Sequence, residues 1–285
     1  MSSPVDQPSP WERLADVVAC PVCGAPLATR DRSPRCPAGH SFDFARQGYL
    51  SLASGAAPGA NADTATMVAA RAAFLDAGHY APLTAELARL AGELAPADGV
   101  LLDAGGGTGH QLAGVLGARP GAVGLTLDLS KYALRRAARA HPRMGAASAD
   151  VWRGLPVRTG AVDLLLNVFA PRNGPEFRRV LAPGGALLVV TPGPGHLAEL
   201  RVSQGLLSVD PAKDERLRRT LAEHFEQTSV VPLEFPLRLT AEEAGALVAM
   251  GPNAHHQPAG GPAAAAPALV SAAFRLSVHR PRAGR

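Results

Sequence analysis

The sequence predicts an α/β protein whose mostly parallel sheet is preceded by a small, separate module. Two observations point to the sheet: short apolar runs recur between stretches of helical character, and a glycine-rich loop follows the first of these runs. The cysteines indicate the module, because all three lie within residues 20–36. At 285 residues and 47% hydrophobic content, the chain suffices for one domain of ordinary size and a small one.

The segment from Leu101 to His110 predicts the end of a first strand, a tight loop and the start of a helix. Two leucines lead into Asp103, and glycines then fall at positions 105, 107 and 109. Glycine is needed where the backbone takes a positive φ or approaches a ligand closely. The spacing does not fit a dinucleotide fingerprint, because the third glycine would fall on His110. The pattern Asp-x-Gly-x-Gly-x-Gly resembles motif I of class I S-adenosylmethionine-dependent methyltransferases.

The stretches that follow fit successive strands of such a sheet. Residues 122–127 predict a second strand, closed by Asp128, and an acid at that distance from the loop accepts hydrogen bonds from a ribose diol. Ser130 predicts the N-cap of a helix over Lys131–Arg139. After a third short strand, Asp150 lies where an acid often meets the adenine amino group in this superfamily. Residues 162–167 form the nearly continuous apolar run of a central parallel strand.

The remaining elements are predicted from the flanking segments. Residues 180–190 carry the L-x-P-G-G turn that precedes the fifth strand in many class I methyltransferases. Residues 83–94 and 214–225 predict helices, and Thr240 predicts the cap of a helix that runs to about Met250. Residues 269–278 alternate in part and predict a last strand, which corresponds to the antiparallel seventh strand of these folds.

The cysteines and one histidine predict a metal site. Cys20, Cys23, Cys36 and His40 have the spacing C-x2-C-x12-C-x3-H, and an odd number of cysteines argues against a complete disulfide framework. Two thiolates two residues apart hold one side of a tetrahedral Zn²⁺, and a second pair about a dozen residues later completes it. Because four protein ligands leave no open position, we expect one structural zinc per chain.

Aromatic and basic residues lie beside this metal site. Phe42, Phe44 and Tyr49 occur together with Arg35 and Arg46. Such residues suit stacking on unpaired RNA bases and contact with phosphates. The alternative is that the three aromatic side chains form the small core of the module.

Taken together, these motifs resemble one family. Cys-Pro-x-Cys-Gly-x-x-Leu, followed by Cys-x-x-Gly-His-x-Phe-Asp-x-Ala-Arg-x-Gly-Tyr-Leu, is similar to the N-terminal module of the 23S rRNA (guanine-N1)-methyltransferases of the RlmA/TlrB type. Residues 74–83, 191–197 and 250–256 resemble further family motifs in the same order, so the likeness covers most of residues 20–256. Two segments depart from it: residues 51–67 contain no lysine or arginine, and residues 257–267 are of low complexity.

The resemblance implies a class I (Rossmann-like) methyltransferase domain with a mostly parallel seven-stranded sheet. We therefore expect a zinc-binding RNA-recognition module over residues 1–50, a linker over 51–68, and an S-adenosylmethionine-dependent methyltransferase domain over 69–285. The resemblance also implies zinc at the four predicted ligands and cofactor contacts from Tyr80, Thr108, Gly109 and His196. The physical interpretation of the loop and the strand ends adds Asp103, Gly105, Gly107, Asp128 and Asp150.

The implied reaction is transfer of a methyl group to N1 of a guanine in a 23S rRNA hairpin loop, with macrolide-type resistance as its consequence. The sulfonium of the cofactor already activates the methyl group, so alignment is the main task of the protein. In the loop after the fourth strand, Phe169 is expected to stack on the base and Asn167 to bind its edge. The alternative for Asn167 is a cap that closes the strand.

Two other functions stay open at this stage. A small-molecule methyltransferase that tailors an antibiotic would keep the glycine loop but has no need of the zinc module. A catalytically silent RNA-binding protein is disfavoured by the intact acid and glycine pattern. Incubation with labelled cofactor and either rRNA or small-molecule pools distinguishes the three.

Charge and hydropathy set the expected surroundings of the protein. The net charge of +4 permits a polyanionic partner. No apolar run reaches the 18 residues of a membrane helix, and Met1–Pro10 lacks a signal-peptide pattern. We therefore expect a cytoplasmic protein that does not associate with membranes. The family resemblance implies a homodimer with an RNA cleft between its subunits.

Overall fold

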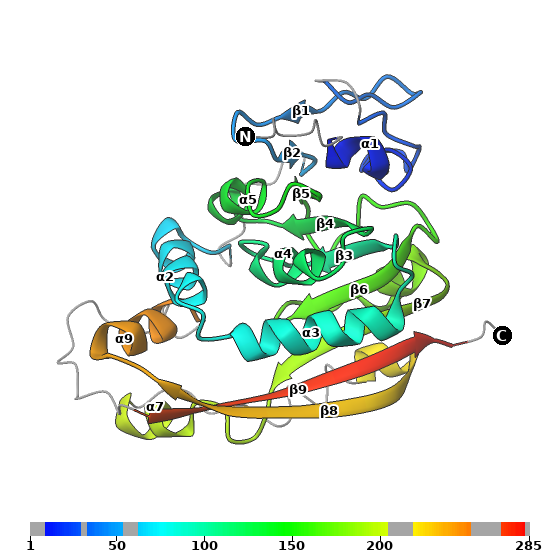
Figure 1. Ribbon diagram of the computed structural model, residues 1–285. Coiled ribbons are helices and arrows are strands. Elements are labelled where there is room, and N and C mark those ends of the chain that lie inside the picture. The colour runs from blue at the N-terminus through cyan, green and yellow to red at the C-terminus, as the bar shows by residue number, and fades with distance from the viewer. Residues whose placement is uncertain (1–8, 30–32, 54–61, 205–218, 252–268, 283–285) are drawn as a thin grey trace, which may run out of the picture.

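The computed structural model describes residues 9–29, 33–53, 62–204, 219–251 and 269–282. Its strands form one sheet with the order β1-β2-β5-β4-β3-β6-β7-β9-β8 (Figure 1). The strands are β1 Asp43–Phe44, β2 Leu50–Ser51, β3 Val100–Ala104, β4 Val123–Asp128, β5 Met144–Ser148, β6 Val162–Val168, β7 Leu181–Pro192, β8 Phe225–Arg238 and β9 Leu269–Pro281.

The seven strands from β3 to β9 are the predicted mostly parallel sheet. Strands β5, β4, β3, β6 and β7 run parallel, whereas β9 pairs antiparallel with both β7 and β8. The two further strands, β1 and β2, come from the N-terminal module and extend the sheet beyond β5. The strand order reverses between β3 and β6, and ligands of α/β sheets bind at such a point, outside the carboxyl ends of the strands.

Helices cover both faces of the sheet (Figure 1). Because side chains alternate along a strand, Leu164 of β6 faces one core cluster and Leu165 the other. Among the described helices, none combines the length and apolar character needed to cross a membrane. The helices are α1 Pro10–Leu14, α2 Ala65–Asp76, α3 Ala81–Leu94, α4 His110–Gly117, α5 Lys131–Ala137, α6 Gly174–Val180, α7 Ala198–Gln204 and α9 Ala241–Ala249.

Predicted caps and helices are confirmed where the local signal is strong. Ser130 caps α5, and Thr240 forms a capping box with Glu243 at the start of α9. The helix predicted over residues 214–225 is wrong at its end, because residues 219–222 are helical but β8 begins at Phe225. Its first five residues lie outside the described part of the chain.

The N-terminal module is joined to the large sheet by backbone pairing. Leu50 of β2 pairs with Ala147 of β5, and the Ser148 hydroxyl accepts hydrogen bonds at 2.9 Å from the backbone N–H groups of Leu52 and Ala53. Helix α2 begins at Ala65, inside the range 51–68 that we predicted to be a linker. The module therefore continues the sheet through β2.

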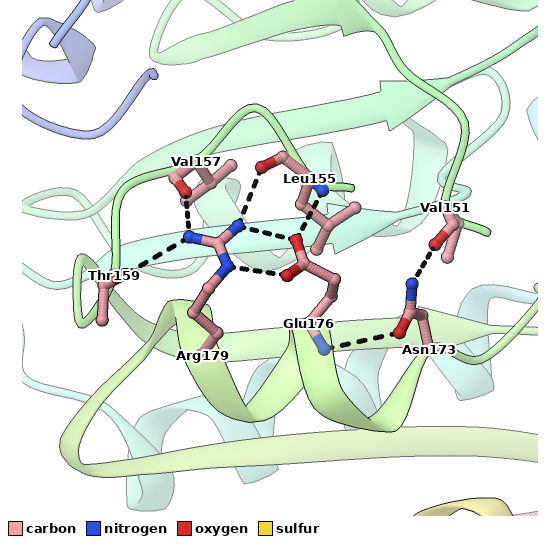
Figure 2. A network of polar contacts seen from close by, with 7 residues as sticks. All are labelled: Val151, Leu155, Val157, Thr159, Asn173, Glu176 and Arg179. Atoms are coloured by element: carbon pink, nitrogen blue, oxygen red, sulfur yellow. Dashed lines mark hydrogen bonds and ion pairs between the residues drawn. The ribbon is translucent and has the colours of Figure 1, made fainter. Parts of the chain in front are cut away.

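A polar network on α6 holds the segment that follows β5 (Figure 2). Asn173 caps α6 and donates a hydrogen bond to the Val151 carbonyl at 2.8 Å. The Glu176 carboxylate accepts from the Leu155 N–H at 2.7 Å and from Arg179, whose guanidinium also donates to the Leu155 carbonyl. Burial raises the pKa of Glu176, but hydrogen bonds from Arg179 and Leu155 outweigh it and the pKa is lowered.

The same segment also pairs with the N-terminal module. The Ala19 N–H donates to the Pro156 carbonyl at 3.0 Å, and the Arg158 N–H donates to the Val17 carbonyl at 2.8 Å. The α6 network thus holds the segment 151–158, whose backbone also pairs with the N-terminal module.

Candidate active site and metal centre

Cys20, Cys23, Cys36 and His40 come together in the structure as predicted. Their ligand atoms all lie within 4.8 Å of one another. The Cys23 and Cys36 sulfurs are 3.7 Å apart, and His40 Nδ1 lies 3.3 Å from the Cys36 sulfur and 3.6 Å from that of Cys20. In a tetrahedral site with Zn–S bonds of about 2.3 Å, neighbouring sulfurs lie about 3.8 Å apart. The four residues therefore fit one closed zinc site.

Two glycine turns shape this site. Gly24 and Gly39 have φ of 72° and 83°, and their N–H groups donate to the carbonyls of Cys20 and Cys36 at 2.8 and 2.9 Å. Burial raises the pKa of Cys36, but hydrogen bonds from His40, Cys23 and the backbone N–H groups of this turn lower it to about 6. The turn therefore favours the thiolate, which is the form that binds a metal.

The aromatic residues of the module pack internally. Phe42 is buried, Phe44 contacts Trp11 with ring centroids 5.0 Å apart, and Tyr49 packs against the main core. For Phe42 and Phe44 the structure thus favours the alternative interpretation, a small core of the module, whereas Tyr49 packs on the main core of the protein. Arg35 and Arg46 are exposed.

The glycine loop lies at the carboxyl end of β3 and has the predicted conformation. Gly105, Gly107 and Gly109 all have positive φ, at 81°, 57° and 75°. A Cβ added at Gly105 would lie 2.6 Å from the Cβ of Ala170, in the loop after β6. Gly106 is equally constrained, since its added Cβ would collide with Thr126 and Asp103. The loop therefore packs closely between the ends of β4 and β6.

Two acids support this loop from below and from the side. Asp128 accepts hydrogen bonds from the N–H of Gly107 at 2.9 Å and from that of Ser130 at 2.8 Å. Burial raises the pKa of Asp128, and these two hydrogen bonds oppose the shift. Asp103 is 1% exposed, and burial together with the charge of Asp128 raises its pKa to about 7. Asp103 thus lies beneath the loop, while Asp128 flanks it.

The other predicted cofactor residues lie around the same edge of the sheet. Thr108 is buried within the loop, and Asp150 follows β5, where its carboxylate accepts from the Trp152 N–H at 3.0 Å. Tyr80, at the start of α3, is 3% exposed, and burial raises the pKa of its hydroxyl.

His196 joins Tyr80 through a residue that the sequence analysis did not identify. Phe274 of β9 lies 5.1 Å from the Tyr80 ring and 4.8 Å from the His196 ring. Burial, and then Arg201, lowers the pKa of His196 to about 4, so the imidazole is neutral at pH 7. Its Nδ1 accepts a hydrogen bond from the Ala273 N–H at 3.3 Å. The neutral ring therefore presents Nε2–H as a donor.

Phe169 and Asn167 have different surroundings after β6. Phe169 is 47% exposed and has a φ of 55°, which is uncommon for a bulky residue and typical of functional positions. Its ring stacks against His196 with centroids 6.4 Å apart. Asn167 is fully buried, and its amide donates to the carbonyls of Ala104 and Pro171 at 3.2 and 2.8 Å. Asn167 therefore braces this loop, and its contact with a base stays a prediction.

A second pair of residues at the glycine loop was not predicted. Arg71 of α2 forms an ion pair with Asp63, and its other terminal nitrogen donates to the Met250 carbonyl at 2.9 Å. The Asp63 carbonyl in turn accepts from the Ser130 hydroxyl at 2.8 Å. Short local patterns give no signal for the contacts with Met250 and Ser130, because these two residues lie far from Arg71 and Asp63 in the chain.

The residues present fit S-adenosylmethionine. The loop brings bare backbone to the point where strand order reverses, and Asp128 offers carboxylate oxygens beside it, as a ribose diol requires. Phe169, Phe274 and His196 provide an aromatic surface next to this loop. The fold and this site define a class I methyltransferase domain that carries an N-terminal zinc ribbon.

Comparisons with known proteins place the chain more narrowly. The zinc-ribbon family model described as RlmA, N-terminal, matches residues 18–53. The 23S rRNA (guanine(748)-N(1))-methyltransferase of Streptomyces fradiae is 56% identical over 84% of this chain and 85% of its own length. A Micromonospora griseorubida protein whose name places it among the 23S rRNA (guanine-N1)-methyltransferases is 54% identical over 92% of this chain and 96% of its own length. The chain belongs to the family of 23S rRNA (guanine-N1)-methyltransferases.

A more distant relative carries the same description. The Bacillus subtilis (strain 168) protein YxjB, also named for that activity, is 33% identical over 64% of this chain and 66% of its own length.

Proposed function

We propose that this protein transfers a methyl group from S-adenosylmethionine to N1 of a guanine in a hairpin loop of 23S rRNA. The observation that carries the proposal is the identity of 54% and 56%, over 92% and 84% of the chain, to relatives named for guanine-N1 methylation of 23S rRNA. The zinc ribbon also disfavours the small-molecule alternative, because that chemistry does not require it.

We assign the cofactor to the edge formed by the glycine loop and the ends of β4 and β5. When bound, it supplies a methyl group that its sulfonium has already activated. Asp128 accepts from the ribose diol, and Asp150 lies where the adenine amino group is expected. The backbone from Gly105 to Gly109, with Thr108, contacts the rest of the molecule, and Asp103 supports the loop from beneath. Tyr80 and His196 complete the set by family resemblance.

The acceptor base is assigned to the exposed ring of Phe169. Phe169 lies in the loop after β6, is 47% exposed, and stacks its ring beside His196. Stacking on such a ring is available to any base, so it orients the guanine but does not select it. A guanine in a structured hairpin must leave its stack to reach this ring. Asn167 fixes the loop through its bonds to Ala104 and Pro171.

RNA contact is assigned to basic side chains on the module and on α5. Arg35 and Arg46 of the module are exposed, as are Lys131, Arg135 and Arg139 on or just after α5. The module and the end of α5 meet near Arg46 and Arg139, because a Cβ added at Gly48 would lie 3.7 Å from the Cβ of Ala138. Arginine suits phosphate contact, and binding through several such contacts is salt-sensitive.

The zinc has a structural part in this proposal. Four protein ligands surround the site, so the metal has no open position for substrate and stabilises the module instead. Residues 1–50 serve as the recognition module and residues 69–285 as the catalytic domain. We further propose a cytoplasmic homodimer whose activity confers macrolide-type resistance. Light scattering in solution and drug susceptibility of an expressing strain test the last two points.

Labelled cofactor tests the proposal against its alternatives. Purified protein is incubated with methyl-labelled S-adenosylmethionine and either 23S rRNA or a small-molecule extract. The proposal predicts label in the rRNA alone. Label in a small metabolite favours a tailoring enzyme, and the absence of label from both favours a silent RNA-binding protein.

A further inference from the structure

The guanidinium of Arg71 lies against the glycine loop. A Cβ added at Gly107 would be 3.2 Å from Arg71 Nη1, and the N–H of Gly107 donates to Asp128. Arg71 comes from α2, before the first strand of the methyltransferase domain, and its side chain is 26% exposed. A cation thus stands directly beside the backbone that we assign to the cofactor.

The electrostatic surroundings of Arg71 are dominated by acids. Asp63 forms an ion pair with it, and the charge of Arg71 acts to lower the pKa of Asp128, whereas Asp63 acts to raise it. Burial is the largest influence on Asp128 and raises its pKa. Such a site suits the two positive groups of S-adenosylmethionine, the sulfonium and the ammonium. Arg71 already pairs with Asp63, and its guanidinium has N–H donors to offer to an anionic group of the ligand as well.

The cofactor offers one group of that kind. Its adenine and ribose are neutral at pH 7, and its carboxylate is the only anionic part. Arginine binds carboxylates through two parallel N–H···O bonds, and a guanidinium has five N–H donors. In the described part of the chain, Asp63 and Met250 each accept a hydrogen bond from Arg71. The guanidinium of Arg71 therefore has enough N–H donors to bind a further carboxylate.

We propose that Arg71 binds the carboxylate of the methionine moiety of S-adenosylmethionine, with Asp63 and the Met250 carbonyl holding the guanidinium at the loop. This inference rests on the cofactor assignment in the proposed function. It also gives a role to the Met250 carbonyl, because the Arg71 bond ties the end of α9 to the cofactor edge.

A pair of ligands isolates the predicted contact. S-adenosylhomocysteine has the amino-acid end of the cofactor, whereas 5′-methylthioadenosine has the same nucleoside and sulfur without it. Calorimetry on the full chain compares both ligands in the wild type and in Arg71→Met. We expect Arg71→Met to weaken S-adenosylhomocysteine about 10- to 150-fold, the range of hydrogen bonds to charged groups. Its affinity for 5′-methylthioadenosine stays unchanged.

Two further variants complete the experiment. Arg71→Lys keeps the charge but not the paired donors, so it loses less affinity, again for S-adenosylhomocysteine alone. Arg89→Met removes an arginine that pairs with Glu86 and Glu93 on α3, and it should bind both ligands as the wild type does.

Equal loss for both ligands in Arg71→Met would make Arg71 a support of the loop and overturn the inference. Unchanged affinity for both would overturn it as well. Retained binding of 5′-methylthioadenosine shows that the variant is folded at the site. A wild type that binds neither ligand would refute the cofactor assignment itself, and the inference with it.

Discussion

Substitution of Gly105 by alanine perturbs both the glycine loop and the loop after β6. Gly105 has a φ of 81°, and the left-handed conformation costs an L-residue with a side chain about 1–2 kcal/mol. Its new Cβ would lie 2.6 Å from the Cβ of Ala170, about 1 Å closer than an ordinary carbon–carbon contact. Relief of such overpacking costs about 1–3 kcal/mol. We therefore expect a total loss of stability of about 2–5 kcal/mol.

The loss should extend to ligand binding, because Ala170 follows Phe169. Separation of the two loops moves the backbone at the cofactor and the ring assigned to the base. Urea denaturation measures the free energy of unfolding, and calorimetry measures the affinity for S-adenosylhomocysteine. Gly117→Ala is the matched control: it lies at the end of α4, its added Cβ would meet nothing within 4 Å, and alanine favours the helix. A Gly105→Ala protein as stable as the wild type, with the same affinity, would refute the close packing of the loop.

Three further predictions concern the metal, the ribose acid and pH. Purified protein should contain about one zinc per chain, and its thiols should react only after the metal is removed by a chelator. A zinc content well below one per chain, with three freely reactive thiols, would contradict the site. Asp128→Ala should weaken S-adenosylhomocysteine by about 1–3 kcal/mol in calorimetry, and unchanged affinity would exclude its contact with the ribose. Burial and the charge of Arg172 lower the pKa of His279 to about 4. Between pH 4 and 6.5 the folded protein therefore binds fewer protons at His279 than the unfolded chain does. The free energy of unfolding should fall as the pH falls through that window, by at most about 1.4 kcal/mol per pH unit. His279→Gln should flatten this slope in urea melts, and an unchanged slope would show that His279 does not cause it.

The elements that were predicted correctly are those with a local chemical signature. The alternate glycines of the loop, the Ser130 cap and the four zinc ligands are each defined within about twenty residues, and each lies where expected. Strand β8 is not among the strands located from the sequence, and it contains two prolines, Pro232 and Pro236. The structure tolerates them because β8 is the last strand of the sheet, where one side needs no partner.

Contacts between distant segments were beyond the sequence patterns. The pairing of Leu50 with Ala147 joins the module to the sheet, and the sequence of the two-residue strand β2 does not predict which strand it pairs with. Asn167 is buried and donates to the carbonyls of Ala104 and Pro171, and its contact with Ala104 of β3 had no local signal. Arg71 meets Gly107 because α2 packs against α9 and α5, which no local motif encodes.

The position of the transferred methyl group tests the central claim most directly. 23S rRNA lacking this modification is treated with the enzyme and S-adenosylmethionine, digested, and examined by mass spectrometry against authentic N1-methylguanosine. We predict one new N1-methylguanosine, located in a fragment from a hairpin loop. A methyl group on another atom or another base, or rRNA that gains none, would contradict the assignment of this chain as an rRNA guanine-N1 methyltransferase.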